Sequence, residues 1–230
     1  GFDMKTKKKR FGKILLTAVL FLFGIACIFP FIFMLSSSFK PLNEIFVYPI
    51  KLIPEHFIFT NYTEVFSEKY NFIQWYGNTL VMVFMIIVLK IGIVTLTAYA
   101  FARLRFKGRD ILFLVLLSSI MIPPDAVIVP KYVIFKAFGI VDSMWSIILP
   151  SIFDVFFVFM VRQFFLAIPE TLSEAAIIDG CSHFKIYSRI ILPLAKPAIV
   201  TMILFTFIWA WNDYMGPYIF ITSPEKQMLS

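Results

Sequence analysis

The feature that most restricts this chain is the length of its apolar runs. Ile14–Leu35 and Tyr76–Phe101 each exceed the roughly 20 residues that a helix needs to cross a bilayer, and Lys90 is the one charged residue inside them. Hydrophobic residues make up 60% of the 230 positions and charged residues 15%, whereas soluble domains average about 45–50% and 25%. The chain is therefore an integral membrane protein, which excludes an ordinary soluble enzyme, a secreted disulfide scaffold and a disordered protein.

Three further apolar runs follow, at Ile111–Val129, Trp145–Phe165 and Leu194–Tyr214. They are continuous, whereas the strands of a membrane barrel alternate apolar and polar residues in short segments. The sequence therefore predicts an all-α, polytopic membrane protein with five spans.

The distribution of Lys and Arg predicts the orientation of these spans. If the N-terminus is cytoplasmic, the inner segments carry more than twice as many basic residues as the outer segments, as the positive-inside rule requires. The inner segments are 1–13, 102–110 and 162–196, and the outer segments are 36–75, 130–144 and 215–230. The net charge of +7 is thus explained by topology, and no nucleic-acid partner is expected.

We therefore predict a cytoplasmic tail over residues 1–13 and a single transmembrane domain over residues 14–230, with a long cytoplasmic loop at 166–193. Five spans place the C-terminus outside, and the residues after Tyr214 have the composition of an outer loop. We expect a sixth span to follow in the natural protein, beyond this sequence.

The loop at 166–193 contains two short helical patterns, Glu170–Asp179 and Ser182–Ile191, separated by Gly180. An acidic residue suits the start of the first helix, and glycine permits the left-handed backbone that ends a helix and allows a sharp turn. The first helix also carries Ala175 and Ala176, which leave a low surface that another protein can approach closely.

The second pattern is amphipathic. Phe184, Tyr187 and Ile191 share a predicted apolar stripe, Lys185 and Arg189 lie on the other face, and a proline then ends the pattern. Amphipathicity alone allows two interpretations, an interfacial helix lying on lipid headgroups or an element that docks on a partner protein.

The spacing of residues in this loop resembles the "EAA" signature of ABC importer permeases. Each defined position of that signature is matched, so the resemblance is more specific than a lone short motif. The matching residues are Glu174, Ala175, Ala176, Gly180, Ile190, Leu192 and Pro193, with Asp179 in the acidic position that usually precedes the glycine.

Other stretches resemble the carbohydrate branch of this family, the six-span maltose-permease type, and the resemblance covers nearly the whole chain. They are Ser38-Phe39-Lys40, Tyr99-Ala100-Phe101-Ala102-Arg103, Met121-Ile122-Pro123-Pro124, Arg162-Gln163-Phe164-Phe165 and Trp211-Asn212-Asp213. The sequence departs from the family pattern at the C-terminus, where the final span and tail are missing.

The resemblance implies the transmembrane domain of a type I ABC importer in a prokaryotic inner membrane. It implies a second permease subunit, which would be a different chain, two cytoplasmic ATPase subunits and an extracytoplasmic binding protein that delivers a sugar or oligosaccharide. ATP and Mg would bind the ATPase subunits, and this chain would bind no cofactor. The loop over residues 170–193 would couple the translocation path to the ATPases, with Glu174 supplying a polar contact and Gly180 the bend.

Charged residues within spans are functional candidates because their burial in a bilayer is costly. Lys90 and Asp154 have opposite signs and would pair if the second and fourth spans touch, which we favour over a substrate role. Asp125 follows two prolines at the outer rim of a broken helix, where irregular backbone is tolerated only against protein or a water-filled cavity. This position mildly favours a gate.

A sugar path calls for aromatic faces and for amide or carboxylate groups. Asn78, Trp209, Asn212 and Asp213 supply that mixture and are the candidate substrate-path residues. The alternative is an aromatic belt at the membrane interface, which we favour for Trp211.

No phosphate-binding loop of the Walker type occurs, and no catalytic or metal site is predicted, so we do not expect an enzyme. Two alternatives to a sugar importer remain. One is an ion-coupled secondary carrier, which would show internal repeats and midplane ion ligands. The other is an ABC importer permease for a non-carbohydrate solute.

Overall fold

The computed structural model describes residues 2–67 and 70–229, with side chains from residue 12 onward. The regular structure of this described part is helical throughout, without strands, which confirms the predicted all-α class. The chain divides into two compact units, Gly1–Tyr70 and Asn71–Ser230. Most side chains of the predicted tail at 1–13 lie outside the described residues, and the single domain predicted over 14–230 stays a prediction.

The first unit begins with the long helix α1 (Phe2–Ser38), whose segment Gly12–Ser38 is long and apolar enough to cross a membrane. All but one of its large apolar side chains from Ile14 to Leu35 are exposed, the exception being the half-buried Phe33. A helix that is apolar on all sides is suited to lipid rather than to water.

A compact turn follows α1 and includes α2 (Leu42–Ile45) and α3 (Thr60–Val65). Lys40, only 2% exposed, directs its ammonium group to the carbonyl oxygen of Lys51. The side-chain amide of Asn61 donates to the carbonyl oxygens of Ser38 and Lys40, both at 3.0 Å. The Ser38-Phe39-Lys40 motif therefore organises the segment that returns along the end of α1.

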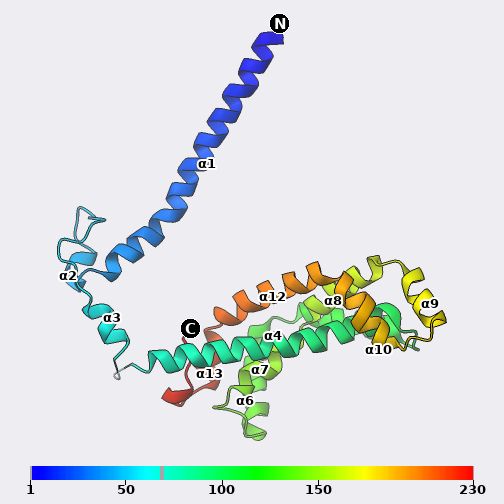
Figure 1. Cartoon of the computed structure of the whole chain (residues 1–230). Helices are drawn as coiled ribbons and strands as arrows, with labels where there is room; N and C mark the ends of the chain where they lie inside the picture. The colour runs from blue at the N-terminus through cyan, green and yellow to red at the C-terminus, as the bar shows by residue number, and fades with distance from the viewer. Residues whose placement is uncertain (1, 68–69, 230) are drawn as a thin grey trace. The chain divides into compact units, whose positions relative to one another are not determined.

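The second unit is built around α4 (Phe72–Arg103), which packs along α8 (Val155–Ala167) and α12 (Lys196–Trp211) (Figure 1). Buried residues of α4 contribute to two separate hydrophobic clusters. The loop-end cluster includes Val94 and Ala98 of α4 together with Phe157 and Ile191, and the opposite-end cluster includes Met82 and Ile148.

Several helices of the second unit are interrupted. Helix α5 (Arg109–Ser118) and turn η1 (Ser119–Met121) meet η2 (Pro124–Val127) and α6 (Ile128–Ala137) at a bend of 93°. The bend coincides with the two prolines of the Met121–Pro124 motif, because proline removes a backbone donor and disfavours helix in the residue before it. Helix α7 (Trp145–Ser151) ends just before α8, and Asp154 caps the start of α8 by accepting from the amide of Phe156 at 3.0 Å.

The loop after α8 contains α9 (Glu170–Ile178), α10 (His183–Ile186), a π-helical turn η3 (Tyr187–Ile191) and α11 (Leu192–Leu194). A bend of 77° separates this segment from α12. The chain then continues through α13 (Met215–Phe220) and η4 (Pro224–Lys226). In the described part, three helices are long and apolar enough to span a membrane, and counting each bent pair as one span gives up to five.

Candidate functional site

The turn between the two loop helices has the geometry predicted for Gly180. Its φ angle is +78°, in the left-handed region. Its amide donates to the carbonyl oxygen of Ile177, and the amide of Cys181 donates to that of Ala176, both at 2.9 Å. This pair of bonds is the Schellman arrangement that satisfies the last carbonyl groups of a helix.

Helix α9 rests on the rest of the unit through small side chains. Ser173 and Ala176 are buried, whereas Glu174 and Ala175 on the same helix are exposed. The two alanines of the motif therefore have different environments: Ala176 packs inward, and Ala175 leaves a low outward surface beside Glu174. Asp179 is exposed at the end of the helix.

The second loop helix differs from the predicted apolar stripe. Tyr187 and Ile191 are buried, but Phe184, predicted on the same stripe, is 69% exposed, and Ile186 is buried instead. The prediction for Phe184 was wrong because residues 187–191 form a π-helical turn. Its wider i to i+5 period changes which side chains share a face.

Four exposed apolar side chains flank the Gly180 bend in the sequence, three on α9 and one on α10. Ile178 is 85% exposed and Phe184 69%, and Leu172 and Ile177 are also exposed. We call these four residues the loop face. Because so many large apolar side chains in a short loop are costly to leave in water, the loop face has the character of a contact surface.

At the base of the loop, an arginine of α4 and an arginine of α8 each donate to backbone carbonyl oxygens of the opposite segment. The guanidinium of Arg103 donates to the carbonyl oxygens of Phe165 and Ile168, at 2.7 and 2.5 Å, and thereby caps the C-terminal end of α8. Arg162 in turn donates to the carbonyl oxygen of Phe101 at 3.2 Å. The Tyr99–Arg103 and Arg162–Phe165 motifs are thus parts of a single joint between α4 and α8.

A cavity of about 520 Å³ lies between this joint and α9. Tyr99 and Arg103 line it from α4, and Ser173 and Glu174 line it from α9. The last residues of the motif lead into α12: Ile190 and Leu192 are partly buried against the loop-end cluster, and Pro193 is exposed.

The four candidate substrate-path residues make separate sets of contacts. The amide nitrogen of Asn78 donates to the carbonyl oxygens of Glu225 and Gln227, at 3.0 and 2.9 Å. The Asn212 amide donates to the carbonyl oxygen of Ile208 on its own helix at 2.7 Å.

The other two candidates lie in different surroundings. Trp209 is half exposed and packs on Phe157, with the ring centroids 5.3 Å apart. Asp213 accepts from the amide of Gly216 at 3.0 Å and lines a second cavity of about 210 Å³ that Asp125 also lines. Trp211 packs edge-on against Tyr76 at 5.7 Å.

The predicted pairing of Lys90 with Asp154 is confirmed. The Lys90 ammonium lies 3.4 Å from a carboxylate oxygen of Asp154 and 5.1 Å from the centre of the Phe157 ring. Lys90 is 5% exposed, and along α4 it lies between the residues of the two hydrophobic clusters. Because Asp154 also caps α8, the pair ties α4 to the point where α7 and α8 separate.

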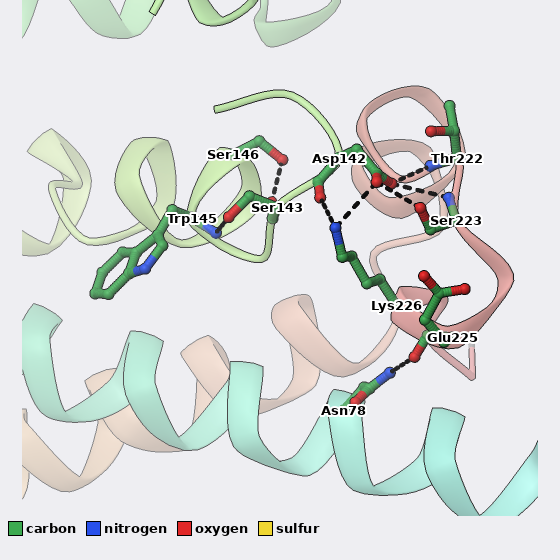
Figure 2. Close-up of polar contacts among 9 residues, drawn as sticks. All are labelled: Asn78, Asp142, Ser143, Trp145, Ser146, Thr222, Ser223, Glu225 and Lys226. Carbon is green, nitrogen blue, oxygen red and sulfur yellow. Dashed lines mark hydrogen bonds and ion pairs between the residues drawn. The ribbon is translucent and has the colours of Figure 1, made fainter. Parts of the chain in front are cut away.

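Asp142 holds a polar cluster that the sequence analysis missed (Figure 2). One carboxylate oxygen accepts from the amides of Thr222 and Ser223, at 2.9 and 2.8 Å, and the other accepts from the Ser223 hydroxyl and from Lys226. The Ser223 hydroxyl and these other donors hold the pKa of Asp142 well below its usual range. Its φ of +60° is a conformation that Asp tolerates better than most residues.

The same terminal segment is also bound to α4. The indole of Trp75 donates to the carbonyl oxygen of Pro224 at 2.8 Å, and the amide of Leu229 donates to the Thr79 hydroxyl at 2.9 Å. The segment is therefore fastened to α4 on one side and to the loop around Asp142 on the other. We call residues 221–229 the fastened segment. Among the described residues, no group of three His, Cys, Asp or Glu side chains could hold a metal ion.

A bundle of lipid-compatible helices, with exposed apolar side chains on one bent loop, defines a polytopic membrane protein. Residues 94–230 match the family described as binding-protein-dependent transport system inner membrane component. The chain belongs to this family of ABC importer permeases, whose members are transport subunits rather than enzymes.

Individual relatives agree with the family match. The chain is 32% identical to the arabinooligosaccharides transport system permease protein AraQ of Bacillus subtilis, over 93% of this chain and 76% of that protein. It is 31% identical to the polygalacturonan/rhamnogalacturonan transport system permease protein YtcP of the same organism, over 95% and 76%. A bacterial ABC transporter that imports the acidic polysaccharide alginate has the same fold, with a TM-score of 0.86, 24% identity and coverage of 94% and 76%.

Proposed function

We propose that this chain is the transmembrane subunit of an ATP-driven importer for a sugar or oligosaccharide. The loop over residues 170–193 would transmit the movements of a cytoplasmic ATPase to the spans. The observation that carries the proposal is the loop itself, in which the Schellman turn at Gly180 joins two short helices that expose Ile178 and Phe184. Large apolar side chains at a bend suit insertion into a hollow on a partner protein.

An exposed carboxylate near the loop face would also suit a contact with such a partner. Glu174 is exposed on α9 beside the low surface of Ala175, where its carboxylate is available to a basic group of the ATPase. We assign Glu174 to that polar contact and Gly180 to the bend. Asp179, Ile190, Leu192 and Pro193 complete the coupling element, since they shape the turn and lead it into α12.

The substrate class rests on the relatives. The names of AraQ and YtcP refer to arabinooligosaccharides and to polygalacturonan or rhamnogalacturonan, so we propose an oligosaccharide as the solute. A second, different permease chain, two ATPase subunits that bind ATP and Mg, and an extracytoplasmic binding protein would complete the transporter. The N-terminus would lie in the cytoplasm of a prokaryotic cell, as the distribution of basic residues predicts.

For the substrate path, Asp213 is the strongest of the sequence candidates, because its carboxylate lines a cavity together with Asp125. Trp209 and Asn212 offer an exposed ring and an exposed amide on α12. The Asn78 amide is bound to the fastened segment, so we assign Asn78 to shaping the path rather than to contacting the sugar.

The test is uptake of labelled arabino- and rhamnogalacturono-oligosaccharides by cells that carry or lack this chain. We expect uptake to require the chain and to be lost in Gly180→Asp, while the protein level in the membrane is unchanged. Vanadate should block uptake, and a protonophore should block it only as far as it depletes ATP. Uptake that follows the ion gradient at constant ATP would contradict the proposal and favour a secondary carrier.

A further inference from the structure

One buried hydrogen bond joins the loop after α8 to α4. The hydroxyl oxygens of Thr95 and Tyr187 lie 2.7 Å apart, although the residues are 92 positions apart in sequence. Thr95 is 0% exposed and Tyr187 is 7% exposed. A polar contact at this depth is strong because water does not compete for either group.

The direction of this bond follows from the protons available. The Thr95 hydroxyl lies 2.5 Å from the carbonyl oxygen of Ile91 and donates to it. A threonine hydroxyl has one proton and two acceptor lone pairs, so Thr95 accepts the proton of Tyr187. A chain of two hydrogen bonds therefore runs from the loop through Thr95 to the backbone of α4.

The Tyr187 ring is held as firmly as its hydroxyl. It packs against Tyr99 of α4 with centroids 5.4 Å apart, and Tyr99 packs against Phe165 of α8 at 6.5 Å. Tyr187 is also the first residue of the π-helical turn, and its neighbours Ile186 and Ile191 are fully buried. Such turns often occur at functional sites.

Arg103 of α4 also holds the start of the loop, through the carbonyl oxygen of Ile168, but the other polar attachments of the loop to α4 and to the segment after it are weaker. The ion pair between Arg105 and Glu170 spans 3.5 Å and is exposed on both sides, so it contributes little. Helix α9 buries only the small side chains of Ser173 and Ala176. Moreover, the loop is continuous in sequence with α8 and α12 but not with α4, so a displacement of the loop reaches α4 only through contacts of this kind.

We propose that Tyr187 is a positioning residue for transport, which makes the loop and the adjoining end of α4 move as one body through its hydrogen bond to Thr95. This role rests on the proposed function, because it requires an ATPase that displaces the loop. Tyr187 is not one of the four loop-face residues. It lies within the span 174–193 of the EAA signature but occupies none of its defined positions.

The chain offers matched variants. Tyr187→Phe removes the donor, and Thr95→Val removes the acceptor and strands the buried Tyr187 hydroxyl, which is the more costly loss. Thr95→Ser keeps the acceptor and should behave as the native chain does. Tyr99→Phe is the control, since it deletes a neighbouring tyrosine hydroxyl that makes no hydrogen bond within the described part of the chain and leaves the ring in place.

The measurement is hydrogen–deuterium exchange in the complete transporter, with and without ATP and vanadate. In the native complex, trapping with vanadate should change exchange both in residues 170–186 and in residues 95–105. In Tyr187→Phe and Thr95→Val the change in the loop should persist, while the change at 95–105 falls by about threefold to tenfold, as expected for the loss of one hydrogen bond. Equal amounts of co-purified ATPase would show that assembly is intact.

Two results would overturn the proposal, and they are distinguishable. If residues 95–105 respond to vanadate in Tyr187→Phe as they do in the native complex, the hydrogen bond between Tyr187 and Thr95 does not couple the loop to α4. The proposed function is then unaffected. If neither segment of the native complex responds, the ATPase does not act on the loop. The coupling role of Tyr187 and the proposed function then both fail.

Discussion

The two ends of the second unit share buried apolar packing but differ in their polar contacts. At the loop end, α4 meets the loop through buried apolar side chains, through the neutral hydroxyls of Thr95 and Tyr187, and through Arg103, which donates to the carbonyl oxygen of Ile168. At the opposite end, the fastened segment buries Ile221 and Met228 in the opposite-end cluster and is held in addition by a carboxylate, an ammonium group and several carbonyl oxygens. The difference suggests that the loop end transmits movement through packing, whereas the opposite end keeps a surface segment in one conformation.

The largest effect is expected between the two ends, at Lys90. Lys90→Met should lower the free energy of unfolding by about 2 kcal/mol, because it leaves the Asp154 carboxylate without its partner, although that carboxylate is partly exposed. Adding Asp154→Asn should restore most of the loss, since asparagine still caps α8 without a charge. Denaturant titration in mild detergent measures both variants, and a double variant as unstable as the single one would contradict this account.

At the loop end, Gly180→Ala tests the backbone rather than the packing. A Cβ atom at this position would meet nothing within 4 Å, so the cost is the left-handed conformation alone, about 1–2 kcal/mol. Gly180→Asn should cost less, because asparagine adopts this conformation more readily. Thermal unfolding of the purified chain compares the two, and equal losses would show that conformation is not what the glycine supplies.

At the opposite end, Asp142→Ala should release the fastened segment. Amide exchange in residues 221–229 should rise by about tenfold as the segment opens locally, while exchange in the loop is unchanged. Asp142→Asn keeps a residue that tolerates positive φ but removes the charge, so a smaller rise is expected. If the loop opens as well, the two ends are coupled and the contrast between them is wrong.

The smallest effect is the response to pH. The folded pKa of Asp142 is depressed by its hydrogen bonds to Ser223 and its other donors, so its contribution to stability is complete above the ordinary carboxyl pKa of about 3.9 and is lost as the pH falls below it. The fastened segment should therefore stay closed from pH 7 to pH 5. The fluorescence of Trp75, obtained by difference from Trp75→Phe, reports this, and a transition above pH 5 would contradict it.

The sequence predicted the helical class and the pairing of Lys90 with Asp154, because hydropathy and the cost of buried charge act wherever the spans pack. It also predicted the bend at Gly180, because the left-handed backbone that glycine permits is a local property of the chain. It did not predict the π-helical turn, and therefore misplaced Phe184, because a change of helical period depends on what the turn packs against. Asp142 escaped notice because its partners lie some 80 residues further along the chain.

The four substrate-path residues show the same limit. Their types suit a sugar, but Asn78 is bound to backbone carbonyl groups that come close only after folding. Asp213 instead lines a cavity that Asp125 and Lys131 also line, and this grouping depends on the 93° bend after Met121. Side-chain chemistry can be read from the sequence, whereas the grouping of those side chains requires the path of the chain.

The coupling role of the loop is tested by co-purification of this chain with its ATPase in mild detergent, followed by mass spectrometry. The native chain, Glu174→Lys, Ile178→Asp and, as a control at the opposite end, Asp142→Ala would be compared. We predict that a subunit with a Walker-type phosphate loop accompanies the native chain and Asp142→Ala but is lost from both loop variants. Its equal retention by the loop variants, or its absence from the native preparation, would contradict the assignment of the loop as the coupling element.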